Sequence, residues 1–72
     1  MNNNEIFNEE LMRLITKMLA NIYYFDCDPV VEIGFCVNCI ETLVGRSFSE
    51  KETATWFDAL KNIADDALNN YI

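Results

Sequence analysis

The sequence predicts an all-α fold with three helices, near residues 4–25, 29–44 and 49–70. Apolar residues recur at steps of three and four through each of these stretches, which is the period of an α-helix. Pro29 stands where the second helix should begin, and Gly45 stands where it should end. Because the chain has 72 residues, we expect one helical domain that spans residues 1–72.

The first helix carries an unusually wide apolar stripe. Its apolar residues form two adjacent rows, one of Leu11, Ile15, Met18 and Ile22 and one of Met12, Leu19 and Tyr23. A stripe of this width predicts that the helix is covered on two sides. Tyr23, Tyr24 and Phe25 follow one another, and a helix turns about 100° per residue, so the three rings cannot all face one core. We expect the neighbours of Tyr24 to face the core and Tyr24 to contact a partner.

The second helix is apolar on nearly every side, which predicts that it is the most buried of the three. Asp28 and Pro29 are a typical N-cap and first residue for a helix. Residues 30–38 also alternate between apolar and other residues, as a strand would. We favour the helix because its pattern continues from Cys39 to Val44 and because no partner strand is evident, but the strand remains an alternative.

The third helix begins with Ser49 followed three residues later by Glu52, a capping box. Its apolar face includes Trp56, Phe57, Leu60, Ile63, Ala64, Ala67 and Leu68. Its opposite face carries Asp58, Asp65 and Asp66, which we expect to lie in water and to face any basic partner. Asp65 and Asp66 lie near the C-terminal end, where the helix dipole disfavours negative charge.

The net charge of −7 limits the classes of partner. Binding to nucleic acid requires lysine and arginine to neutralise phosphates, so direct binding is not expected. Anionic membrane surfaces are disfavoured for the same reason. The sequence shows neither a secretory signal nor an apolar run of about 20 residues, so we expect a cytoplasmic protein that does not enter a membrane.

Three cysteines raise the question of a metal or redox site. Cys36 and Cys39 have the Cys-x-x-Cys spacing of metal ligands, with Cys27 and either Asp26 or Asp28 to complete a set. The chain has no histidine and no second Cys-x-x-Cys, and the strand-to-helix context of a redox motif is missing. We therefore expect largely buried, reduced thiols and neither a metal nor a cofactor, with the metal and redox sites as alternatives.

The sequence predicts no catalytic role. Histidine, the commonest acid-base group, is absent, and so is a glycine-rich loop for phosphate. Ser47 and Ser49 have no base nearby in the sequence. A chain this short has little room for a pocket of the usual size.

These patterns predict a protein-interaction module that forms a homodimer, because three helices leave more apolar surface than one copy can cover. A short, acidic, asparagine-rich helical chain resembles, in composition alone, accessory proteins of phages and other mobile elements. The resemblance implies a regulator or inhibitor of a partner protein and assigns no residue. The alternative function is an acidic mimic of nucleic acid that blocks a DNA- or RNA-binding enzyme. The candidate partner-binding residues are Tyr24, Asp58, Asp65 and Asp66.

Overall fold

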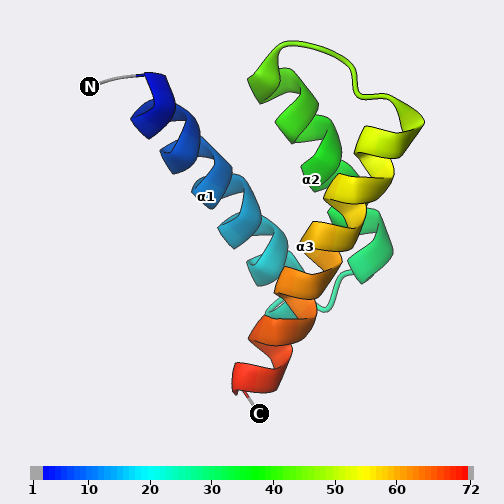
Figure 1. Ribbon diagram of the computed structural model, residues 1–72. Coiled ribbons are helices and arrows are strands. Elements are labelled where there is room, and N and C mark those ends of the chain that lie inside the picture. The colour runs from blue at the N-terminus through cyan, green and yellow to red at the C-terminus, as the bar shows by residue number, and fades with distance from the viewer. Residues whose placement is uncertain (1–2, 72) are drawn as a thin grey trace.

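Three helices follow one another in the computed structural model, which describes residues 3–71: α1 (Asn3–Tyr23), α2 (Pro29–Val44) and α3 (Glu50–Tyr71) (Figure 1). The predicted all-α fold is confirmed. Residues 30–38 lie within α2, so the strand alternative for this segment is wrong.

α1 ends two residues before the predicted boundary. The amide of Tyr24 still donates to the Ala20 carbonyl at 2.8 Å, but the amide of Cys27 reaches back to the Asn21 carbonyl at 3.0 Å and closes the turn. Asp26 adopts a φ of 55° in the left-handed region, where aspartate is one of the more tolerated residues. Tyr24 and Phe25 therefore lie in the turn that follows the helix.

Both ends of α2 are capped as the sequence predicts. The Asp28 carboxylate accepts the amide of Val30 at 2.9 Å, and Pro29 occupies the first turn. Gly45 has a φ of 88°, which favours glycine, and its amide donates to the Glu41 carbonyl at 2.9 Å.

The capping box of α3 is also present. The Ser49 hydroxyl accepts the amide of Glu52 at 3.1 Å, and the Glu52 carboxylate accepts the amide of Ser49 at 3.2 Å. Each group therefore satisfies one of the free amides at this helix end.

Several side-chain interactions fix the short connection from α2 to α3. Arg46 forms a two-pronged ion pair with Glu52, with N–O distances of 2.5 and 3.1 Å, and its guanidinium lies 5.4 Å from the centre of the Phe48 ring. Phe48 stacks on Trp56 at 6.1 Å between ring centres, and its amide donates to the Glu41 carboxylate at 2.8 Å. These contacts tie the end of α2 to the first two turns of α3.

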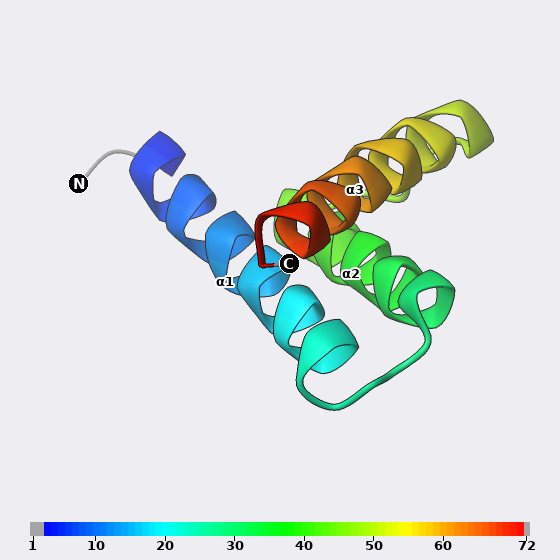
Figure 2. The same ribbon diagram turned by 90° about the horizontal axis from the view of Figure 1, so that it is seen from below.

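α2 lies antiparallel to α1, and α3 crosses α2 and comes close to α1 near the C-terminal end of α1 (Figures 1 and 2). Two hydrogen bonds mark these junctions. The Asn21 amide group donates to the Glu32 carboxylate at 3.0 Å, joining α1 to α2. The Tyr23 hydroxyl donates to the backbone carbonyl of Ala64, joining α1 to α3.

Within the described residues, the buried core contains Met18, Ile22, Ile33, Cys36, Val37, Ile40, Leu60 and Ala64. Half of these residues belong to α2, so α2 is the centre of the packing, as predicted. However, the molecule measures 36 × 31 × 18 Å, and its thinnest dimension is about two helix diameters. A layer arrangement this thin leaves one side of α2 uncovered.

The chain exposes more surface than its mass predicts. Its accessible area is 5382 Å², whereas a folded monomer of this size is expected to expose about 4,600 Å². The large apolar side chains that remain exposed include Ile6, Met12, Tyr24, Phe25, Val30, Val31, Phe35, Val44, Ile63 and Leu68. A single copy therefore leaves apolar surface on all three helices in contact with water.

Candidate protein-binding site

The turn after α1 separates three consecutive aromatic rings. Tyr23 is half-buried and packs on the core, while Tyr24 and Phe25 are 81% and 72% exposed. The predicted outward position of Tyr24 is confirmed. The expectation that both of its neighbours face the core is wrong for Phe25, because the helix has ended and the backbone at Asp26 turns away.

Tyr24 borders a groove between α1 and α3 with a volume of about 540 Å³. Its lining consists of Thr16, Leu19, Ala20, Tyr23, Tyr24 and Ala67. None of these described residues carries a charge, and Thr16, Tyr23 and Tyr24 supply hydroxyl groups. We call this feature the Tyr24 groove. It has the dimensions of a site for a few side chains of a partner.

The three predicted aspartates do not form one site with Tyr24. All three are exposed, as expected. Asp66 immediately precedes Ala67 in α3, so Asp65 and Asp66 lie along the helix segment that contributes to the Tyr24 groove. Asp58 is two helical turns earlier on the same side of α3 as Asp65, and it borders a hollow that neither Asp65 nor Asp66 lines.

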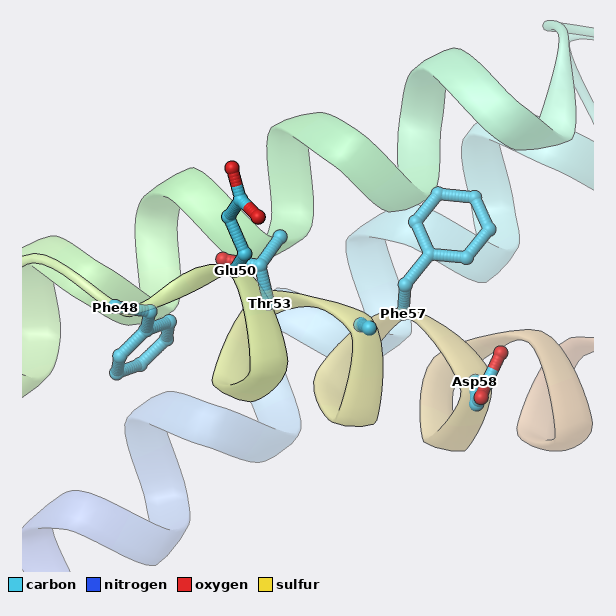
Figure 3. Close-up of a pocket in the computed structure, with 6 residues that line it drawn as sticks. Phe48, Glu50, Thr53, Phe57 and Asp58 are labelled. Carbon is cyan, nitrogen blue, oxygen red and sulfur yellow. The ribbon is translucent and has the colours of Figure 1, made fainter.

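Asp58 borders a second hollow, with a volume of about 450 Å³, beside the start of α3 (Figure 3). Its other lining residues are Phe48, Glu50, Thr53, Ala54 and Phe57. Figure 3 shows the Phe57 ring directed towards α2, with Asp58 one residue further along the helix. The hollow joins an apolar floor to two carboxylates, but it is open and shallow.

The cysteines differ in their surroundings, which corrects the expectation that the thiols are largely buried. Cys36 is buried, Cys27 is half-buried, and Cys39 is exposed on the outer side of α2. Burial raises the pKa of the Cys36 thiol to about 11, with a smaller contribution from Cys39. Desolvation, followed by the carboxylates of Glu32 and Asp26, raises the pKa of Cys27. These two thiols are therefore poor nucleophiles at neutral pH.

No group of three or more His, Cys, Asp or Glu side chains is placed to hold a metal ion within residues 3–71. Over the same part of the chain, no helix is both long enough and apolar enough to cross a membrane.

The sequence did not predict two surface features. The first is the Tyr24 groove, which depends on how α3 crosses α1. The second is the exposure of Val31 and Phe35, at 49% and 58%, on a helix that the sequence predicts to be buried. The near-absence of polar residues in segment 29–44 indicates that some apolar side chains of α2 must remain exposed, but it does not identify the side of the helix on which they lie.

The fold and its surfaces thus define a small three-helix domain with an aromatic groove and an acidic third helix. Comparisons of the chain with protein-family models, with curated proteins and with solved structures found no match.

Proposed function

We propose that this protein is a homodimeric interaction module that regulates or inhibits a partner protein, which it binds through the Tyr24 groove. The observation that carries the proposal is the position of Tyr24, 81% exposed at the edge of an apolar groove. Aromatic side chains concentrate binding energy at protein interfaces. Tyr24 presents such a side chain to solvent beside a recess in which a partner side chain fits.

The negative charge of the chain favours a partner with basic residues. The chain has a net charge of −7, and Asp65 and Asp66 are exposed in the part of α3 that contains Ala67, which lines the groove. A segment with an apolar residue for the groove and lysine or arginine near it would be attracted to this end of the molecule. The two aspartates would mainly accelerate association, while Tyr24 would set the lifetime of the complex.

Excess surface supports the homodimer. The accessible area exceeds the value expected for a monomer by about 800 Å², which is close to what each partner contributes to a standard protein–protein interface. A second copy would cover apolar side chains that one copy leaves in water.

The test uses the whole chain as bait in extracts of the native cells, with mass spectrometry to identify a partner, followed by titration of the purified pair. Tyr24→Ala should weaken binding at least about thirtyfold, as loss of a central aromatic does. Phe25→Ala is the matched control, because Phe25 is also exposed but does not line the groove, and it should bind as the wild type does. Undiminished binding by Tyr24→Ala would remove the groove from the proposal.

Mimicry of nucleic acid is the second candidate function, and the exposure of Asp58, Asp65 and Asp66 on α3 favours it. Lys51 and Lys61, also exposed on α3, interrupt the negative row. Under this alternative, changing the three aspartates to asparagine would abolish binding to a DNA- or RNA-binding enzyme. Tyr24→Ala would then have little effect, and binding would weaken steeply with salt.

A further inference from the structure

The outer side of α2 is an uncharged surface in a strongly acidic chain. Val31, Phe35 and Cys39 follow one another at steps of four along this side, with Asn38 and Thr42 beside them, and all five are exposed. We call these five residues the α2 stripe. None of them is charged, although the chain as a whole carries a charge of −7.

Both carboxylates of α2 accept hydrogen bonds from other parts of the molecule. Glu32 accepts a hydrogen bond from Asn21 of α1, and Glu41 accepts one from the amide of Phe48. Both residues are half-buried. The charges of this helix are therefore used to hold the fold together, and the stripe itself presents only apolar and neutral polar groups.

Phe35 forms the crest of the stripe, with a hollow on each side. The hollow towards α1, of about 390 Å³, is also lined by Leu14, Lys17 and Cys36. The hollow towards α3, of about 310 Å³, is also lined by Gly34 and Phe57. A ridge between two hollows fits a second ridge of the same kind, because side chains of one helix pack into the grooves of another.

Gly34 is an independent indication of close packing on this side. It lies in the middle of α2, where glycine weakens a helix relative to alanine. A Cβ atom at this position would meet nothing within 4 Å, and the backbone does not have a positive φ. A single copy therefore gives no reason for glycine here, whereas the close approach of a second backbone would provide one.

We propose that the α2 stripe is the surface through which two copies of this chain associate, with Phe35 of each copy seated in a hollow of the other. This inference rests on the homodimer proposed above and assigns its interface. A basic partner would be drawn to the carboxylates of α3, whereas a second copy, with the same net charge, is repelled least where the surface is uncharged. Two charged residues line the hollow towards α1, the exposed Lys17 and the half-buried Glu32, which is hydrogen-bonded to Asn21, so this hollow adds no net negative charge to the interface.

A two-fold arrangement follows from the self-complementary shape. An isologous interface uses the same patch on both copies, so each residue of the stripe would meet a residue of the partner's stripe. The Tyr24 groove lies between α1 and α3 and shares no lining residue with either hollow. Self-association would therefore leave the groove of each copy open to a partner.

The test is sedimentation equilibrium on the full chain, with Phe35→Glu compared with Met12→Glu. The two residues are exposed to similar extents, 58% and 61%, but Met12 lies on α1 outside the stripe. The wild type and Met12→Glu should sediment at about twice the 8.3 kDa chain mass. Phe35→Glu should raise the dissociation constant at least about thirtyfold while keeping the helical circular dichroism of the wild type.

The possible results distinguish failure of the proposed interface from failure of the proposed homodimer. A dimer that survives Phe35→Glu overturns the α2 stripe and leaves the homodimer standing. A wild type that stays monomeric up to millimolar concentration overturns both, without bearing on partner binding at the Tyr24 groove.

Labelling of Cys39 provides a second measurement that requires no substitution. Cys39 is exposed on the stripe of a single copy, so its reaction with N-ethylmaleimide, followed by peptide mapping, should slow severalfold as concentration rises through the dimer midpoint. A Cys39 labelling rate that does not change with concentration, in a wild type that dimerises, would overturn the proposal even if Phe35→Glu failed to fold.

Discussion

Glu52 shows how one residue can serve several parts of the fold. Its carboxylate pairs with Arg46 in the loop and accepts the amide of Ser49 at the start of α3. The hydrogen bonds from Arg46, followed by the bond from the Ser49 amide, lower the pKa of Glu52 from 4.5 to about 2. The charged form is therefore more favourable in the folded chain than in the unfolded chain.

The lowered pKa of Glu52 predicts a specific loss of stability in acid. Because the folded pKa lies below the unfolded value, the contribution of Glu52 is complete above about pH 4.5 and disappears as the pH falls towards 2. Urea unfolding across this range should show a decline in the wild type that is smaller in Glu52→Gln. Glu50→Gln, the same change two residues earlier in the same helical turn, is the control and should decline as the wild type does. Equal declines in all three proteins would contradict the role of Glu52.

At the scale of a single helix, two leucines of α3 that differ in burial allow the contribution of burial to stability to be measured. Leu60 is fully buried, whereas Leu68, two turns further along, is 42% exposed. Leu60→Ala should cost about 2–5 kcal/mol of the free energy of unfolding, as truncation of a buried leucine does. Leu68→Ala removes the same atoms and should cost much less. Urea denaturation of both variants at one protein concentration measures the difference. Similar losses in the free energy of unfolding would contradict the burial of Leu60 and the exposure of Leu68.

The sequence predicts the helix boundaries well where the signal is local. Asp28, Pro29, Gly45 and the Ser49 capping box act within one turn of chain, and the structure has each of them. The end of α1 is less well predicted, because no glycine or proline marks Tyr23 and the turn depends on a left-handed Asp26.

The surfaces are harder to predict than the helices because they depend on tertiary packing. Segment 29–44 is apolar on nearly every side, so its composition does not show whether Phe35 or Ile33 faces the core. The crossing of α3 over α2 decides this, and it leaves Phe35 and Cys39 outside. For the same reason, the pairing of Tyr24 with Ala67 across the groove follows only from the arrangement of α1 and α3.

At the scale of the whole molecule, the protein is both thin and strongly acidic. The Cα radius of gyration is 12.5 Å, whereas about 11 Å is expected for a compact domain of this length. The extended shape agrees with the large exposed area.

The charge of the whole molecule predicts opposite effects of salt on the two proposed associations. Two copies that each carry a charge of −7 repel, and added salt screens the repulsion. Self-association should therefore strengthen between 50 and 300 mM NaCl, over which the screening length falls about 2.4-fold. Binding of a basic partner at the Tyr24 groove should weaken over the same range. Sedimentation and titration calorimetry measure the two constants. Self-association that weakens with salt would indicate that ion pairs hold the copies together, contrary to an uncharged interface.

The stack of Phe48 and Trp56 gives the protein its own optical probe. Trp56 is the one tryptophan in the chain, and it is half-buried where the connection after α2 folds back onto α3. Its fluorescence should shift to longer wavelength when this corner opens to water. Trp56 lines neither the Tyr24 groove nor the hollows beside Phe35, so the emission reports the integrity of the fold independently of occupancy at either surface. A variant that loses binding but keeps the wild-type emission spectrum has lost a contact and retained its shape.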